Sequence, residues 1–261
     1  MNNIFKNRYE LKLKFKSLKT MFAGWISFSH PSITEIFSNM NVDFIAIDME
    51  HSTISIEQSQ RIIAASQSYN VPCLPRPVSQ SNDYFKPILD SGADGLIVST
   101  VESTLQIENI IANIKFPEIG KRTYGVNRAH NYGFDTLKYY QEWNNSSSII
   151  LQIETKEGLE NLEDLLKYEQ VDAVMVGPYD LSGSLGIPGQ FENKIYTEAC
   201  FELIGLSRKY NKSCGTQIAK VDGSSISKNL EYGFNFIVLG SDLFVLSDWA
   251  DTTNKLITKF Q

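Results

Sequence analysis

The sequence predicts an α/β fold, specifically a TIM-type (β/α)8 barrel in which eight parallel strands alternate with helices. The prediction begins with eight short apolar runs, rich in valine, isoleucine and leucine, that are separated by stretches with helical periodicity. The length of 261 residues suits one such barrel, and 42% hydrophobic residues are enough for one large core. A doubly wound open sheet is the rival fold, but no G-x-G-x-x-G motif follows the first apolar run.

The apolar runs do not alternate strictly with polar residues, which is typical of parallel strands that are buried on both faces. In chain order, the expected strands are Met21–Phe28, Asp43–Met49, Val71–Arg76, Gly95–Ser99, Ile149–Glu154, Asp172–Val176, Ser213–Ile218 and Phe234–Leu239.

Between these runs, apolar residues recur every three or four positions, as on one face of a helix. Glycines follow two such regions, Gly92 and Gly233, where a helix C-cap is expected. The expected helices are Ser55–Ser68, Thr104–Ile114, Glu157–Tyr168, Lys194–Lys209 and Leu243–Phe260.

Residues 1–20 carry six lysines and arginines and lack the apolar stretch of a secretory signal. Within them, residues 8–18 are expected to form a short polar helix or an extended cover over one end of the fold. We therefore expect residues 1–261 to form one barrel domain with residues 1–20 as its N-terminal cover. One connection, Lys115–Asn145, is unusually long and contains Arg122; we interpret it as a βα connection, and long connections of that kind are often functional.

Net charge, the length of the apolar runs and the cysteine spacing limit the kinds of partner and environment that we expect. The net charge of −6 argues against nucleic acid as the main partner. No run approaches the about 18 apolar residues of a membrane span, so no membrane partner is expected. The three cysteines are widely spaced and form no CxxC pair, which fits buried thiols in a reducing cytoplasm.

Ionisable side chains follow four of the expected strands. Asp48, Glu50 and His51 end the second strand, and Arg76 ends the third. Glu154 ends the fifth strand, and Asp180 follows the sixth. Because active sites of TIM barrels lie at the carboxyl ends of the strands, we expect these side chains around one mouth.

Carboxylates on neighbouring strands suggest a metal site. Glu154 and Asp180 offer oxygen ligands that suit Mg²⁺ or Mn²⁺ with positions left for water or substrate, although two solvated loop carboxylates are the alternative. Gln152 faces the same side as Glu154 by the two-residue strand period, so its amide could bind a substrate.

His51 is a candidate base, because Asp48 and Glu50 precede it and a nearby carboxylate can orient an imidazole or raise its basicity. A purely structural histidine is the alternative. Arg76 lies between two prolines, which restrict its backbone to an extended form. Its guanidinium could stabilise a carboxylate or a developing enolate, or it could form a structural ion pair.

Two further features could shape the mouth. The turn from Gly177 to Ser182, which contains Tyr179, could present backbone N–H groups to a substrate carboxylate, or it could be an ordinary capped helix start. Trp25, near the end of the first strand, could form a wall of the pocket or part of the core.

Several of these runs, in this order, resemble the HpcH/HpaI family of class II pyruvate aldolases. The resemblance extends over about residues 20–240 and includes the 26-residue step from Glu154 to Asp180 (180 − 154). The matching runs are Phe44–His51, Pro75–Pro77, Leu89–Ala93, Gln152–Thr155 and Gly177–Ser182.

The resemblance implies roles for these residues. Glu154 and Asp180 would hold a divalent ion, Mg²⁺, Mn²⁺ or Co²⁺, which would chelate pyruvate and act as a Lewis acid on the developing enolate. Arg76 would contact the enolate oxygen, and His51 would act as the base, directly or through a water. Gln152 and the backbone at Tyr179 would position the pyruvate end of the substrate.

Asp90 matches the acid that makes the family's histidine more basic. It is expected at the end of a helix, which in a barrel is normally the wrong end for the active site. It would have to reach His51 through an irregular loop or from a neighbouring subunit, and Asp48 is the local alternative. The family usually has a small residue in place of Tyr179, and Arg122 is followed by Thr123-Tyr124-Gly125 rather than by a glycine directly. These departures leave open which aldehyde the enzyme releases.

The implied function is a metal-dependent aldolase that reversibly cleaves a 4-hydroxy-2-oxo acid to pyruvate and an aldehyde. A Schiff-base aldolase would need a lysine in the mouth, where Lys156 lies two residues beyond Glu154. A lyase or decarboxylase acting on an acyl thioester or an oxaloacetate-like substrate, and a non-catalytic barrel that binds 2-oxo acids, remain alternatives. The resemblance also implies a homo-oligomer, a hexamer in which the helix Leu243–Phe260 is exchanged between subunits.

Overall fold

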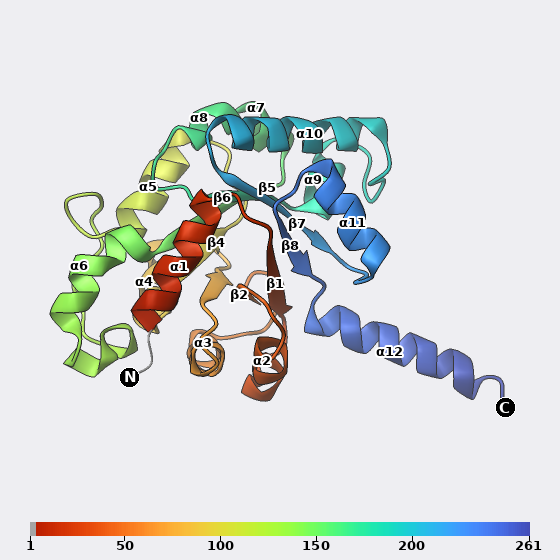
Figure 1. Cartoon of the computed structure of the whole chain (residues 1–261), viewed down its shortest axis with the longest axis horizontal. Coiled ribbons are helices and arrows are strands. Elements are labelled where there is room, and N and C mark those ends of the chain that lie inside the picture. Colours follow the sequence, from red (N-terminus) through yellow and green to blue (C-terminus); the bar gives the residue numbers. More distant parts are fainter. Residues whose placement is uncertain (1–3) are drawn as a thin grey trace.

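The computed structural model describes residues 4–261 and has a nearly closed barrel of eight parallel strands at its centre (Figure 1). The strands are hydrogen-bonded in the order β3-β2-β1-β8-β7-β6-β5-β4. At the remaining seam, the backbone N–H of Asp94 donates to the carbonyl of Cys73 at 2.9 Å. The predicted barrel is thereby confirmed. The strands are β1 (Met21–Ile26), β2 (Phe44–Asp48), β3 (Cys73–Arg76), β4 (Gly95–Val98), β5 (Ser148–Ile153), β6 (Ala173–Val176), β7 (Ser213–Ile218) and β8 (Phe236–Leu239).

Helices surround the barrel, and several of them begin at a side-chain cap. Ser55 and Ser103 each form a capping box, with Gln58 and Gln106 respectively, at the start of the helix that follows. The helices between the first and last strands are α2 (Pro31–Ser38), α3 (Ile56–Ser68), α4 (Asn82–Asp90), α5 (Thr104–Ile114), α6 (Thr136–Ser146), α7 (Lys156–Glu160), α8 (Leu162–Leu166), α9 (Pro178–Ser184), α10 (Lys194–Lys209) and α11 (Gly223–Tyr232).

The helix predicted over Glu157–Tyr168 is divided into α7 and α8. The break falls at Asn161, where φ is −94° and ψ is 0°. Its side-chain amide donates to the carbonyl of Glu102 at 2.7 Å, in the loop that follows β4. This side-chain contact between distant segments holds the chain at the break, and the apolar spacing alone does not reveal it.

The core has two parts, one inside the barrel and one between the strands and the outer helices. At the amino-terminal end of the strands, helix α1 (Ile4–Lys16) packs across the opening. Its Phe15 ring lies 5.9 Å from the rings of both Phe44 and Phe236 inside the barrel. The N-terminal segment is thus helical over this end, while residues 1–3 of the predicted cover lie outside the described residues.

The long connection after residue 114 is not a βα connection, which corrects our interpretation. It joins α5 to β5, so it lies at the amino-terminal end of the barrel, away from the mouth. It contains a short 3-10 helix, η1 (Arg128–Gly133), and α6, which packs against α1 (Figure 1). The predicted helix Thr104–Ile114 directly precedes the connection, and no strand separates the two. The connection therefore follows a helix and leads to a strand.

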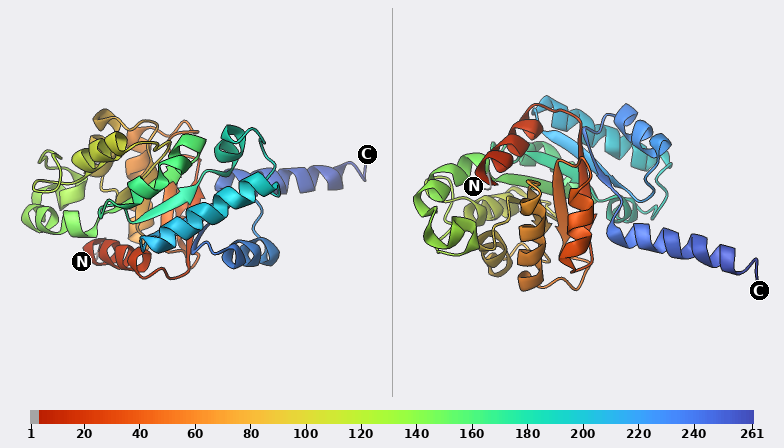
Figure 2. Two further views of the ribbon diagram at one scale, coloured as in Figure 1. Left: turned by 90° about the horizontal axis from the view of Figure 1, so that it is seen from above. Right: turned by 60° about the horizontal axis from the view of Figure 1, so that its bottom comes forward.

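The last helix, α12 (Asp242–Ile257), extends away from the barrel in all three views (Figures 1 and 2). It exposes seven large apolar side chains, Leu243, Phe244, Val245, Leu246, Trp249, Leu256 and Ile257. Helix α11 has no fully buried side chain of its own. Across residues 4–261, none of the helices has both the length and the apolar character needed to cross a membrane. All three cysteines are buried and unbridged, as predicted.

Candidate active site

The inward-facing positions at the carboxyl end of the barrel carry polar side chains. Successive strand residues face opposite sides, so a residue two positions after an interior residue also faces the interior. The interior cluster contains Ala23, Ala46, Leu74 and Ile150. Two positions further along these four strands are Trp25, Asp48, Arg76 and Gln152. The barrel interior is therefore apolar in its middle and polar at its mouth.

These side chains border a cavity of about 460 Å³ at the mouth. Seven of the residues singled out from the sequence line it: Trp25, Asp48, His51, Arg76, Gln152, Tyr179 and Asp180. Sequence reasoning missed several uncharged residues of the wall, among them Ser27, Gln217, Ser241 and Phe244. Gln217 could have been found, because it has inward parity near the end of the predicted strand Ser213–Ile218.

Arg76 is the centre of the polar contacts in this cavity. Its Nη2 lies 2.8 Å from Asp48 Oδ1, and its Nη1 lies 3.1 Å from Glu50 Oε2. Nη1 also donates to Gln152 Oε1 at 3.2 Å. The guanidinium carbon lies 4.8 Å from the centre of the Trp25 ring, a cation–π contact. Arg76 is thus both ion-paired and on the cavity wall, with its orientation fixed from several sides.

His51 is the most exposed of the predicted catalytic side chains, with 66% of its side chain accessible. Its Nε2 lies 3.9 Å from Glu50 Oε2. Asp48 Oδ1 instead accepts from the backbone N–H groups of Glu50 and His51, both at 3.1 Å. Glu50, rather than Asp48, is therefore the carboxylate beside the imidazole within one chain.

Glu154, directly after β5, is a buried carboxylate behind the cavity wall, with 6% of its surface exposed. Thr100 Oγ1 donates to its Oε1 at 2.5 Å, and Gln152 Nε2 donates to its Oε2. Burial raises the pKa of Glu154, and the neighbouring Glu50 and Asp180 raise it further, while the Thr100 hydrogen bond opposes the shift. Three carboxylates, those of Glu154, Glu50 and Asp180, thus lie near one another, and that of Glu154 is shielded from solvent.

A glycine makes room for this carboxylate. A Cβ atom at Gly177 would lie 2.6 Å from Glu154 Oε2 and 2.8 Å from Gln152 Nε2. Any other residue at position 177 would displace one of these two side chains. The close approach explains why β6 leads into α9 through glycine.

Asp180 lies in the first turn of α9, where it is exposed to the cavity. The first backbone hydrogen bond of this helix is donated by Leu181 to the Gly177 carbonyl at 2.9 Å. The N–H groups of Tyr179 and Asp180 precede that bond, and such groups at a helix start can bind an anion. The turn therefore offers a carboxylate and two backbone donors at the same edge of the cavity.

These residues fit a divalent cation of the Mg²⁺ type. No cluster of three or more histidine, cysteine or acidic residues with metal-binding geometry exists within residues 4–261. Mg²⁺ in proteins is commonly held by one or two carboxylates and otherwise by water and substrate, so Glu154 and Asp180 are the two carboxylates that would hold it. Arg76 is the single lysine or arginine among the described residues that line the cavity. An added cation would offset the excess negative charge.

Asp90 and Arg122 lie away from this cavity. Asp90 ends α4, and its Oδ1 lies 2.8 Å from Arg122 Nη2. Arg122 is buried, donates to the Tyr139 hydroxyl at 2.9 Å and stacks near the ring of Trp143 at 4.6 Å. Within one chain, Asp90 is therefore the ion-pair partner of Arg122 and does not contact His51. The reason is topological, since a helix that follows a barrel strand ends at the opposite face.

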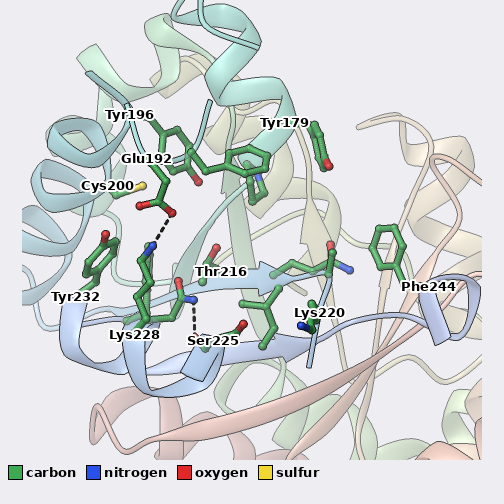
Figure 3. Close-up of a pocket in the computed structure, with 17 residues that line it drawn as sticks. Tyr179, Glu192, Tyr196, Cys200, Thr216, Lys220, Ser225, Lys228, Tyr232 and Phe244 are labelled. Carbon is green, nitrogen blue, oxygen red and sulfur yellow. Dashed lines mark hydrogen bonds and ion pairs between the residues drawn. The ribbon is translucent and has the colours of Figure 1, made fainter. Parts of the chain in front are cut away.

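A second cavity of about 300 Å³ adjoins the first on the outer side of β7 (Figure 3). The two cavities share Pro178, Tyr179, Gln217 and Phe244. The Tyr179 ring, 64% exposed as a residue, meets the ring of Phe191 edge to face at 5.0 Å. The side chain at this position thus borders both cavities, so it affects the space beyond the predicted pyruvate position.

Comparison with known proteins adds independent information. The family model HpcH/HpaI aldolase/citrate lyase matches residues 21–248. A 2-keto-3-deoxy-L-rhamnonate aldolase from Salmonella paratyphi A is 30% identical over 261 residues, covering 98% of this chain and 94% of that enzyme.

Solved structures agree on the fold. An HpcH/HpaI aldolase from Desulfitobacterium hafniense superposes with a TM-score of 0.86 at 24% identity, covering 94% of this chain and 95% of the other. An aldolase/citrate lyase family protein from Burkholderia cenocepacia gives 0.87 at 22% identity, covering 95% and 99%.

Proposed function

The chain belongs to the HpcH/HpaI aldolase/citrate lyase family and is an aldolase, and on this premise we propose that it reversibly cleaves a 4-hydroxy-2-oxo acid to pyruvate and an aldehyde. The relatives named for 2-keto-3-deoxy-L-rhamnonate support substrates of the 2-keto-3-deoxy sugar acid class. The observation that carries the proposal is the cavity at the barrel mouth, which Arg76, His51, Asp180 and Gln152 line together.

Cleavage requires a base, a leaving aldehyde and a stabilised enolate. His51, exposed in the cavity, takes the proton of the C4 hydroxyl as the C3–C4 bond breaks, and the bonding electrons pass to C3 and the C2 oxygen. Arg76 lies where a fixed cation can stabilise that enolate oxygen. Return of that proton from His51 to C3 then completes pyruvate and restores the neutral imidazole. Gln152 and the backbone N–H of Tyr179 bind the carboxylate end of the substrate.

Glu154 and Asp180 would hold the divalent cation, Mg²⁺, Mn²⁺ or Co²⁺. A cation bound there supplies Lewis-acid stabilisation of the negative charge that develops on the substrate oxygens. The gathered carboxylates around Arg76 support this proposal, because they leave negative charge in the cavity that a cation would balance.

The Schiff-base alternative has little support. Lys156 lies at the start of α7 with 66% of its side chain exposed, and its Nζ lies 3.6 Å from Glu160. No lysine occurs among the described residues that line the mouth cavity. Borohydride reduction in the presence of pyruvate should therefore leave the enzyme unmodified.

We also propose that the chain forms a homo-oligomer, with a hexamer favoured by the family resemblance. The exposed apolar side chains of α12 support exchange of this helix between subunits. Such an assembly is also the route by which Asp90 of another chain would reach His51, since Asp90 pairs with Arg122 within its own chain. Sedimentation analysis of the purified chain tests the assembly.

The direct test is pyruvate release from a panel of 4-hydroxy-2-oxo acids, with oxaloacetate and an acyl thioester included for the lyase and decarboxylase alternatives. We expect turnover of the hydroxy acids that is lost after exhaustive chelation and restored by Mg²⁺, Mn²⁺ or Co²⁺. A His51→Ala variant should lose turnover while still binding Mn²⁺. Full activity after chelation would exclude the metal, and turnover of oxaloacetate alone would exclude the aldolase assignment.

A further inference from the structure

We propose that Thr100, with its neighbour Ser99, is a positioning residue that fixes the buried carboxylate of Glu154 and the partly buried carboxylate of Glu50 at the barrel mouth. The inference rests on the proposed function, because it assigns Thr100 the task of holding Glu154 in place for a divalent cation.

Two adjacent hydroxyls reach two different carboxylates. Ser99 Oγ donates to Glu50 Oε1 at 2.7 Å, and Thr100 Oγ1 donates to Glu154 Oε1 at 2.5 Å. Both residues directly follow β4, and in an extended chain successive side chains face opposite sides. Thr100 instead has a φ of +54°, in the left-handed region. This turn of the backbone allows both hydroxyls to face the mouth.

The backbone conformation at Thr100 is costly and is held by its surroundings. A β-branched residue at positive φ is rare, and such strain persists where neighbouring contacts determine it, often at functional sites. Gln80 Nε2 donates to the carbonyls of Ser99 at 2.8 Å and Thr100 at 3.1 Å. Gln106 Nε2 also lies 3.3 Å from the Thr100 carbonyl. Side chains from two other segments therefore fix the loop that carries the hydroxyls.

The result is a carboxylate whose orientation is set before any ligand binds. Each oxygen of Glu154 accepts one hydrogen bond, from Thr100 or from Gln152, and a carboxylate oxygen has a further lone pair for a cation. Partners that orient a ligating carboxylate typically contribute about 10- to 100-fold to metal affinity or activity. Because both donors are neutral, they orient Glu154 without cancelling its charge.

The test measures Mn²⁺ binding to the full-length chain by electron paramagnetic resonance, together with kcat and KM for pyruvate formation. Thr100→Val, which keeps the shape and removes the hydroxyl, should weaken Mn²⁺ binding by about 10-fold or more. Thr100→Gly, which accepts positive φ without strain, should fold well and lose the same affinity. Thr100→Ser, which keeps the hydroxyl, should retain most of the wild-type Mn²⁺ affinity. Thr104→Val, at an exposed threonine in the following helix, is the matched control and should bind as the wild type does.

The outcomes separate this inference from the proposed function. If the wild type binds Mn²⁺ and both Thr100→Val and Thr100→Gly bind it equally well, the positioning role is wrong and the metal site stands. If the wild type itself binds no Mn²⁺ and works after chelation, the metal site is wrong and the positioning role with it. The proposal is supported if Thr100→Val and Thr100→Gly both lose Mn²⁺ affinity while Thr100→Ser keeps it.

Discussion

The two ends of the barrel use the same types of charged residue in opposite ways. At the amino-terminal end, Arg8 Nε lies 2.9 Å from Asp94 Oδ1 with both side chains 1% exposed, and Lys12 Nζ lies 2.6 Å from Asp172. At the mouth, Arg76 faces Asp48 and Glu50, while Glu154 and Asp180 form no ion pair among residues 4–261. The closed end balances its charges and stabilises the fold. The mouth retains an excess of carboxylate, which is the condition for binding a cation.

The largest effect is expected from breaking a pair at the closed end. Asp94 accepts from Arg8, from Gln67 and from the backbone N–H of Cys73. Asp94→Asn removes the carboxylate charge that faces the buried guanidinium, which should lower the free energy of unfolding by about 3–5 kcal/mol. Urea denaturation measures this change, and kcat of the folded fraction should stay near that of the wild type.

The matched control is Asp251→Asn, which breaks the exposed pair with Lys255 and should change the stability by no more than about 1 kcal/mol. Equal losses in both variants would contradict the view that the buried pairs at the closed end stabilise the fold more than an exposed pair does.

A substitution at the mouth should give the converse result. Glu154→Gln keeps the shape of the side chain and can still accept from Thr100, but it removes the charge and places an amide N–H group opposite the Gln152 donor. We expect kcat to fall by about 10²–10³-fold, as for loss of one electrostatic group. Because burial and neighbouring carboxylates disfavour the charged form of Glu154, its pKa is raised. Removal of the charge should therefore offset the lost hydrogen bond and leave the free energy of unfolding close to that of the wild type. Steady-state kinetics and urea denaturation measure the two effects. A destabilised variant with normal kcat would assign Glu154 to the fold instead.

The smallest effect concerns pH and Lys115 at the closed end. Burial and, to a smaller extent, the nearby Lys12 lower the pKa of Lys115 to about 7, and its Nζ lies 2.7 Å from Ser147 Oγ. Between pH 7 and the unfolded pKa near 10.5, the unfolded chain binds more protons than the folded chain, so stability should rise with pH. The contribution is at most about 1.4 kcal/mol per pH unit.

Lys115→Met removes this titration. Urea denaturation at several pH values between 7 and 9 should show wild-type stability increasing relative to the variant. Parallel curves would mean that Lys115 stays protonated in the folded chain, held by its three acceptors, the Asn144 carbonyl, the Ser147 carbonyl and the Ser147 hydroxyl.

Much of the site could be predicted because barrel strands follow local rules. The two-residue period places Gln152 and Glu154 on the same side, and the carboxyl ends of the strands meet at one mouth. The exceptions depend on contacts between distant segments. The motif predicts that Asp90 serves His51, yet within one chain Asp90 pairs with Arg122 because its helix ends at the other face of the barrel. The role of each site residue and the boundary of one domain at residues 1–261 remain predictions.

The sequence by itself determined the order of the eight strands and the chemical types at the mouth, because apolar periodicity and strand-end position are local properties. Only the tertiary structure decided which groups meet. It turned Thr100 into the left-handed region, brought Gly177 against Glu154 and directed α12 away from the barrel. These outcomes depend on packing between segments far apart in the chain, where a few ångströms separate a contact from none.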